Sequence, residues 1–317
     1  MTPSRTLLPV ALVALTATLA ACTGEASASG EDGEVVRIAT QRQPHLYAPY
    51  VYADHAPDGV TIEVVPMANS TDELNALLTG DVDFALLGVP TVISGVAQGK
   101  DVQLVASGAD GGSGLVGSTS VTSVEDLSGA RIGIVPGSSQ EMALRLTLEA
   151  AGLDPDVDTE LVSLGYADMA DALGRGDIDA FAGAEVNVSL AQLEGAHEVA
   201  SIYETAIGPV NIGLATTATR AEQDPELVQQ VVDIHAAATE ALAEDPATWM
   251  SGVADRFSFD PEVLGLAADN IWLRSDLSPT YLDQVDALAG EMQKLAVIDA
   301  APDVDDVVAD GFAPETP

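Results

Sequence analysis

The stretch Ala76–Asp83 reads ALLTGDVD, and the stretch Ala172–Asp179 reads ALGRGDID. Both follow the pattern A-L-x-x-G-D-(V/I)-D, in which a helix ends at a glycine, the chain turns at an aspartate and an apolar strand begins. Glycine is favoured just past a helix because it adopts the left-handed conformation without the steric cost of a Cβ atom. The same helix-to-strand junction therefore occurs twice, which predicts two α/β units of matching architecture.

Apolar runs and helix-start signals alternate around both copies. Short apolar runs predict strands at residues 35–40, 61–65, 81–87, 102–106, 131–135, 161–164 and 178–182. Capping boxes at Ser70–Glu73 and at 137–141 predict helix starts between these strands. After Pro225 the pattern becomes helical, with helices predicted over 226–243, 246–257, 261–272 and 279–295. We therefore expect two mostly parallel sheets flanked by helices, followed by C-terminal helices.

Each copy of the repeat leads into a strand whose far end should face a ligand crevice, because ligands of open α/β sheets bind beyond the carboxyl ends of the strands. The first strand delivers Gly88, Val89, Pro90 and Thr91, and the second delivers the segment 183–186, which contains Glu185. Two matching units with different chemistry at their strand ends suit a two-lobed clamp that closes on a solute.

Three longer segments resemble one protein family. The segments GDVDFALLGVPTVISGVAQGKDVQLVA, SVEDLSGARIGIVPGSSQ and GRGDIDAFAG are similar to solute-binding lipoproteins of ABC importers, in the nitrate, sulfonate, taurine and thiamine-precursor group. The resemblance covers about residues 35–295. It implies a type II periplasmic-binding-protein fold, with lobe I over 34–118, lobe II over 119–209 and a return to lobe I with the C-terminal helices over 210–317. Chain crossings near 118–122 and 208–214 would form the hinge.

Helix starts supply the first candidate ligand contacts. The helices that begin near Ser70 and Thr71, near Pro90 and Thr91, and near Ser138 and Ser139 would point their free N–H groups at the crevice. There they can bind an anionic or strongly polar group. The resemblance strengthens the assignment of Ser138 and Ser139.

Polar side chains beyond the first strand complete the candidate site. The resemblance assigns a binding role to Gln41, and Arg42 offers a planar fork for a sulfonate or carboxylate. His45 follows in the same loop. Glu185 in the crevice would favour a ligand with an ammonium group. Arg42 together with Glu185 would suit a zwitterion such as an aminosulfonate, and Glu185 with Tyr47 or Tyr166 stacking would suit an aminopyrimidine. A solvent-facing arginine and a surface glutamate are the alternatives for Arg42 and Glu185.

The first residues read as a lipoprotein signal. Arg5 precedes the apolar run Leu7–Leu19, which is too short to span a membrane comfortably, and the run ends in Leu19-Ala-Ala-Cys22, which resembles a lipobox. We expect a signal peptide over 1–21, lipidation of Cys22 and a flexible tether over 22–33, with the protein anchored on the extracytoplasmic face of the cell membrane. An ordinary secretory signal is the alternative.

The charge balance restricts the partners. Fifty acidic residues against eleven basic ones give a net charge of −39, which argues against nucleic acid and anionic lipid as binding partners. We expect a monomer whose partners are a small solute and the permease subunits of an importer.

Enzyme and metal motifs are absent from the sequence. It contains no H-E-x-x-H, no G-x-S-x-G and no phosphate-binding lysine loop, its one cysteine is Cys22, and its aspartate-rich turns lack the spacing of a calcium loop. We therefore expect no metal, no cofactor and no catalytic residue. Two further readings stay open: a ligand sensor of the same fold that signals to a membrane receptor, and a pyrimidine-synthesis enzyme.

Overall fold

The structure of the protein is a computed structural model that describes residues 34–309, 311 and 312. The predicted signal peptide, Cys22 and the tether lie outside these residues. Within the described part of the chain, no helix is both long and apolar enough to cross a membrane.

The first of two sheets has six strands in the order β11-β4-β10-β3-β1-β2. Their bounds are β1 Glu34–Thr40, β2 Val60–Pro66, β3 Phe84–Gly88, β4 Gln103–Gly111, β10 Val210–Thr216 and β11 Ile271–Leu273. The second sheet has five strands in the order β7-β6-β8-β5-β9. Their bounds are β5 Ser113–Gly117, β6 Arg131–Ile134, β7 Glu160–Ser163, β8 Ala180–Ala184 and β9 His197–Ala200. The two-lobed α/β fold class is thereby confirmed.

Both sheets are mixed, although most strands of each sheet run in one direction, as expected: β2, β1, β3 and β4 in the first and β7, β6, β8 and β9 in the second. Parallel pairing joins β2-β1-β3 in the first sheet and β7-β6-β8 in the second. The antiparallel strands adjoin the crossings between the sheets: β4 leads into β5, and β10 returns from the second sheet to pair antiparallel with β3 and β4. Because β10 returns from the second sheet, it enters the first sheet at the edge that faces the ligand crevice. It therefore runs antiparallel to its neighbours β3 and β4.

Sheet membership puts the first crossing earlier than expected. Strand β5 pairs with β8, so the chain leaves the first sheet at Gly111 and Gly112 rather than near 118–122. Both glycines have positive φ values, of 74° and 68°. A Cβ atom on Gly111 would lie 2.4 Å from the carbonyl oxygen of Asn270, so this sharp crossing requires glycine.

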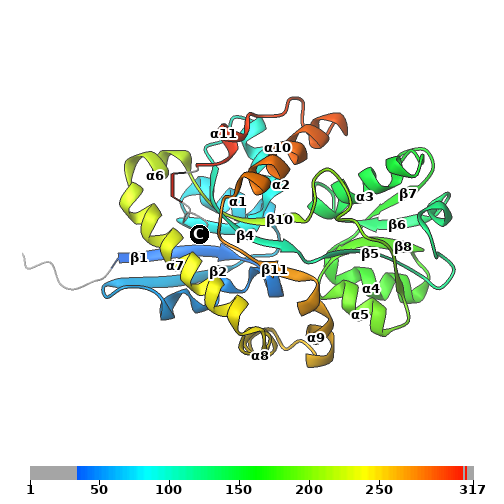
Figure 1. The fold of residues 1–317 in the computed structure, drawn as a ribbon, viewed down its shortest axis with the longest axis horizontal. Helices are drawn as coiled ribbons and strands as arrows, with labels where there is room; N and C mark the ends of the chain where they lie inside the picture. Colours follow the sequence, from blue (N-terminus) through cyan, green and yellow to red (C-terminus); the bar gives the residue numbers. More distant parts are fainter. Residues whose placement is uncertain (1–33, 310, 313–317) are drawn as a thin grey trace, which may run out of the picture. The chain divides into compact units, whose positions relative to one another are not determined.

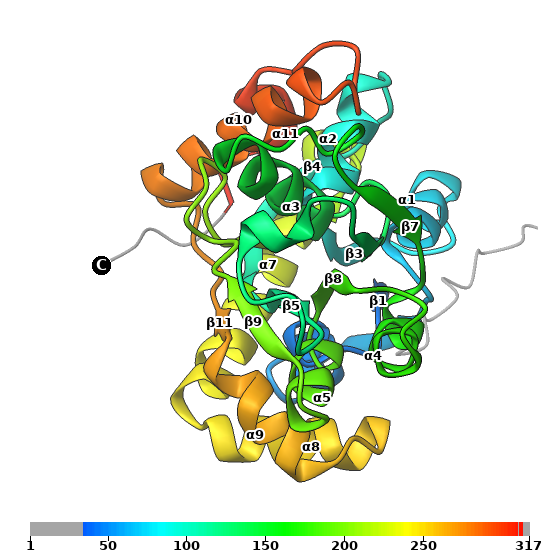
Figure 2. The ribbon, with the colours of Figure 1, turned by 90° about the vertical axis from the view of Figure 1, so that its right-hand side faces the viewer.

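Helices cover both faces of each sheet. Their bounds are α1 Ser70–Thr79, α2 Val89–Ala97, α3 Ser139–Ala150, α4 Tyr166–Arg175, α5 Asn187–Leu193, α6 Ala218–Gln223, α7 Pro225–Glu244, α8 Pro246–Phe257, α9 Pro261–Asp269, α10 Pro279–Lys294 and α11 Val304–Val307, with 3-10 helices η1 Pro44–Leu46, η2 Ala48–Asp54 and η3 Val124–Leu127. In the first sheet α1, α2 and α10 pack on one face and α7 and α8 on the other (Figure 1). Figure 2 shows α3 on one side of the second sheet and α4 and α5 on the other.

The repeated junction has the same hydrogen bonds in both lobes. Gly80 and Gly176 end α1 and α4 in the left-handed conformation, with φ values of 76° and 73°. The last aspartate of each copy then bonds to the neighbouring strand. The carboxylates of Asp83 and Asp179 each accept the backbone N–H of an arginine at 2.9 Å. These arginines are Arg37 in β1 and Arg131 in β6. The sequence repeat is therefore a repeat of structure.

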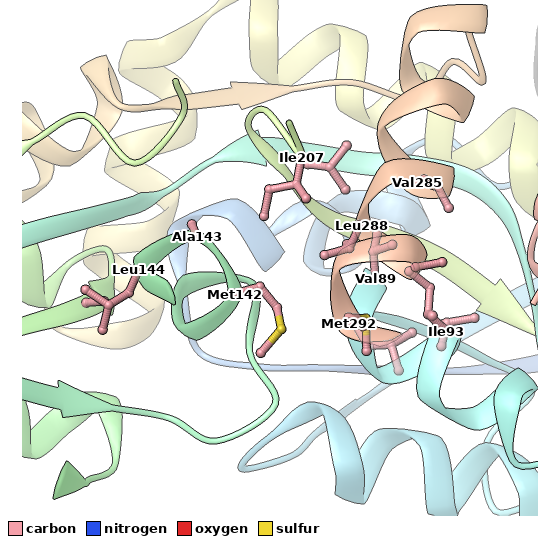
Figure 3. Close-up of a cluster of buried hydrophobic side chains, with 14 of the residues drawn as sticks. Val89, Ile93, Met142, Ala143, Leu144, Ile207, Val285, Leu288 and Met292 are labelled. Atoms are coloured by element: carbon pink, nitrogen blue, oxygen red, sulfur yellow. The ribbon is translucent and has the colours of Figure 1, made fainter. Parts of the chain in front are cut away.

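The C-terminal helices contact both lobes. Helix α10 packs against α2 and also approaches α3, whereas α9 packs against α5. One buried cluster contains Met142 of α3 together with Leu288 and Met292 of α10, all fully buried (Figure 3). The predicted helix starts at Pro246, Pro261 and Pro279 are confirmed, but the predicted helix 261–272 ends at Asp269, where the chain enters β11.

Candidate functional site

A cavity of about 500 Å³ lies between the two sheets. Nine of the twelve predicted ligand-binding residues line it: Gln41, His45, Ser70, Gly88, Pro90, Thr91, Ser138, Ser139 and Tyr166. The strand ends at Gly88 and Ala184 both reach this cavity, so the two copies of the repeat deliver their strands to one shared site.

Four helices begin at the cavity wall, two from each lobe. Helices α1 and α2 start at Ser70 and Val89 in the first lobe, and α3 and α4 start at Ser139 and Tyr166 in the second. Amide groups of a first helical turn have no intrahelical acceptor, and the helix dipole adds partial positive charge there. Neither lysine nor arginine occurs among the residues that line the cavity, so neutral donors dominate its chemistry.

Ser70 is the centre of a hydrogen-bond network on the α1 side. It is the first residue of the helix rather than the predicted N-cap, because the side chain of Asn69 caps α1 by accepting the N–H of Asp72 at 2.9 Å. The Ser70 Oγ atom instead accepts the N–H of Gly88 at 3.0 Å and the Gln41 Nε2 group at 3.1 Å. The network thereby joins the starts of α1 and α2.

The α3 side is held by a second network. Ser138 caps α3, as predicted, by accepting the N–H of Glu141 at 3.1 Å. Ser139 donates from Oγ to Asn211 Oδ1 at 3.1 Å, and Asn211 donates from Nδ2 to the carbonyl of Gly111 at 2.7 Å. Asn211 lies in β10 of the first sheet, so this bond joins the lobes at the cavity wall and reaches the first crossing.

Two titratable side chains in the wall are neutral near pH 7. Burial lowers the pKa of His45 to about 4, and its Nδ1 atom is buried without a hydrogen-bond partner. Burial raises the pKa of Tyr166 to about 12, and its hydroxyl donates to Gln140 Oε1 at 2.7 Å. The wall therefore offers an imidazole and a phenol as neutral hydrogen-bonding groups.

Glu185 does not line the cavity, contrary to the prediction. It is 2% exposed, and its carboxylate accepts the backbone N–H of Ser189 at 3.1 Å and the Ser189 hydroxyl at 2.8 Å. Its other oxygen accepts Asn270 Nδ2 at 2.9 Å. The carboxylate therefore holds the start of α5 through Ser189 and bonds to Asn270, the residue between α9 and β11.

Arg42 and Val89 are also absent from the cavity wall. The guanidinium of Arg42 donates to the carbonyl of Phe257 at 3.2 Å and lies 5.7 Å from the centre of the Phe257 ring. The Val89 side chain is fully buried in the apolar cluster with α10. The chemistry proposed for Arg42 with Glu185 has no geometric basis.

Several lining residues were missed by the sequence analysis. The polar ones are Gln43, Asn69, Asp72, Gln140 and Asn211. Asn69 and Gln140 adjoin predicted helix starts. Asn211 could have been identified from the sequence, because it is a polar residue inside the apolar run VNIGLAT, which is buried. A buried side-chain amide needs a hydrogen-bond partner. Among the described residues, no group of three or more His, Cys, Asp and Glu side chains could hold a metal ion.

Residues 52–248 match the protein family described as NMT1/THI5 like. The chain belongs to this family. The fold of this NMT1/THI5-like protein is that of solved sulfonate-binding proteins: an alkanesulfonate-binding protein SsuA from Xanthomonas axonopodis pv. citri bound to MOPS superposes with a TM-score of 0.75 and 21% identity, covering 87% of this chain and 98% of that one. The periplasmic aliphatic sulphonate binding protein SsuA of Escherichia coli gives 0.74 and 18%, covering 88% and 98%.

Two further likenesses concern the fold and one short stretch of sequence. A Candida albicans protein, described as having the generic periplasmic-binding-protein fold, superposes with a TM-score of 0.66 and 14% identity over 89% of this NMT1/THI5-like chain and 98% of its own. A stretch of 61 residues, 19% of this chain, is 43% identical to the nitrate import ATP-binding protein NrtC of Synechococcus elongatus and covers only 9% of that relative. In its fold, the chain has the predicted resemblance to solute-binding proteins of ABC importers.

Proposed function

We propose that the protein is the extracytoplasmic solute-binding component of an ABC importer, and that its cavity holds the oxyanion head of an organic sulfonate between two lobes. Lipidation at Cys22 would keep it at the membrane, and a permease would receive the solute. Hinge bending at the crossings, with one at Gly111–Gly112, would open and close the cavity.

The observation that carries this proposal is the convergence of four helix starts on one cavity whose wall has no lysine and no arginine. Free amide groups and helix dipoles bind a sulfonate without a cation. Hydroxyl groups of Ser70, Thr91 and Ser138 surround the same space and can supply further neutral donors, whereas the Ser139 hydroxyl already donates to Asn211.

The size and lining of the cavity favour an organic sulfonate over a bare inorganic anion. About 500 Å³ is in the range of sites for organic ligands, and the wall includes the apolar side chains of Leu46, Val135 and Ile212. Nitrate would leave this apolar surface without a partner. The fold shared with two SsuA proteins, whose names state sulfonate binding, supports the same choice.

A thermal-shift screen of the purified protein tests the proposal. The panel holds butane-1-sulfonate, taurine, nitrate, bicarbonate, an aminopyrimidine and amino acids. A ligand that binds only the folded state raises the unfolding free energy by about 2.7 kcal/mol at one hundred times its dissociation constant. We expect the largest rise in melting temperature with the organic sulfonates.

A matched pair of variants completes the test. Ser139→Ala removes a hydroxyl from the cavity wall, and we expect it to weaken sulfonate binding. Ser251→Ala removes an exposed hydroxyl from α8 and should leave binding unchanged. A response to the aminopyrimidine alone, or to none of the sulfonates, would refute the proposal.

A further inference from the structure

A buried carboxyl group lies directly behind the cavity wall. Glu73 is fully buried in the first turn of α1, and its Oε2 atom accepts Gln41 Nε2 at 2.8 Å. Its Oε1 atom has no hydrogen-bond partner within the described part of the chain. Glu73 does not itself line the cavity, but its partner Gln41 does.

The contacts of Gln41 connect this carboxyl group to the site. Both hydrogens of the Gln41 Nε2 group are used, one on Glu73 and one on Ser70 Oγ, which also accepts the N–H of Gly88. An anionic head at the start of α1 would therefore be separated from the Glu73 carboxyl by this single layer of side chains. Two negative charges across so thin a layer of low dielectric repel each other strongly.

Among the described residues, no cation forms a bond with Glu73. Helix α2 and strand β3, which pack against α1, have no titratable residue, and on α1 itself Asp72 adds a like charge. Strand β1 also packs against α1 and carries Glu34 and Arg37, and Arg37 is paired with Glu63. The charge of Glu73 acts on Tyr50 of η2, on which the charges of Arg42 and Arg256 also act. His45, in the same part of the wall, is neutral because burial lowers its pKa to about 4. Burial raises the pKa of Glu73 to about 8, although hydrogen bonds with Gln41 and Ser70 act in the opposite direction.

We propose that Glu73 is a specificity-determining residue that couples anion binding to a proton: the cavity accepts an anionic head group while the Glu73 carboxyl is neutral and releases it when the carboxyl ionises. Above the midpoint of its titration, binding of the anion draws one proton from solvent onto the carboxyl group. The same group discriminates by charge, because a neutral solute gains nothing from the proton. This inference rests on the proposed function and specifies how that site selects its ligand.

Calorimetry on the purified protein with butane-1-sulfonate tests the coupling. Titrations in two buffers of different ionisation enthalpy, from pH 6 to 9.5, give the dissociation constant and the number of protons taken up. We expect a constant affinity up to about pH 8, then a loss approaching tenfold per pH unit, with uptake approaching one proton. Glu73→Gln should show no uptake and a flat profile. Glu63→Gln, which changes an exposed glutamate of β2 in the same lobe, should behave like the wild type.

Two outcomes distinguish a failure of the proposed function from a failure of the Glu73 inference. Absence of sulfonate binding at every pH would overturn the proposed function and this inference with it, whereas binding whose affinity is unchanged between pH 6 and 9.5 would overturn this inference alone. The wild-type titration decides even where Glu73→Gln does not fold. Infrared difference spectra of the ligand-free protein give a second readout, because the carbonyl band of a protonated acid should disappear with a midpoint near pH 8. A wild-type protein without that band at pH 6 would also overturn it.

Discussion

Replacing Glu185 by alanine should destabilise the protein without weakening ligand binding. The substitution removes three hydrogen bonds from a buried carboxylate, two from Ser189 and one from Asn270. A hydrogen bond to a charged group contributes about 1.5–3 kcal/mol, but alanine also removes the cost of burying the charge. We therefore expect the unfolding free energy to fall by about 2–4 kcal/mol, since the two effects partly cancel.

Thermal and urea unfolding of the purified protein measure this loss. For a domain of this size the expected fall in melting temperature is about 5–10 °C. Glu198→Ala, which changes an exposed glutamate of β9 in the same lobe, should leave the melting temperature within about 1 °C, because isolated surface charges contribute little. The affinity for butane-1-sulfonate should stay within about twofold, since Glu185 is outside the cavity wall. Unchanged stability with lost binding would show that Glu185 contacts the ligand and would refute the structural role.

Three other substitutions test separate parts of the structure. Arg42→Ala should leave sulfonate affinity within about twofold by calorimetry, because the guanidinium binds Phe257 and not the cavity, and a tenfold loss would contradict this. Tyr52→Phe removes the 2.6 Å bond to buried His235 and should cost about 1–3 kcal/mol in urea unfolding. Because burial lowers the pKa of His235 from 6.5 to about 4, the unfolded state binds more protons in that range, so wild-type stability should fall as the pH drops from 6.5 to 4; a flat profile would argue against it. Asn211→Leu breaks the bond between the lobes at the cavity wall and should weaken sulfonate binding at least tenfold, which the same calorimetry measures.

The fold was predictable where local rules determine it. The glycine stops at Gly80 and Gly176, the Ser138 cap and the proline helix starts depend on a few adjacent residues, and the structure has each of them where the sequence indicated. The strand β11 and the antiparallel direction of β10 were not predictable in this way. Both depend on how distant segments pair, which no local pattern encodes.

In the candidate site, too, the residues placed by local rules were predictable and those placed by distant partners were not. Helix starts that follow strands reach the cavity because the α/β topology puts them there, so Pro90, Thr91 and Ser139 were found from sequence. The orientation of a charged side chain depends instead on long-range partners. Glu185 turns to Asn270, which is 85 residues away, and Arg42 turns to Phe257, which is 215 residues away. Neither partner could be identified from the neighbouring sequence.

The absence of lysine and arginine from the cavity wall predicts an unusual salt dependence for the proposed sulfonate binding. A net charge of −39 would repel an anion during its approach, yet the groups proposed to hold the anion are largely uncharged. Raising ionic strength from 0.1 to 1 M shortens the Debye length from about 10 Å to about 3 Å, which weakens the approach barrier and hardly changes short contacts. High ionic strength should therefore raise the association rate of an anion and leave its residence time almost constant. A receptor that uses arginine to attract its anion would lose affinity under the same conditions.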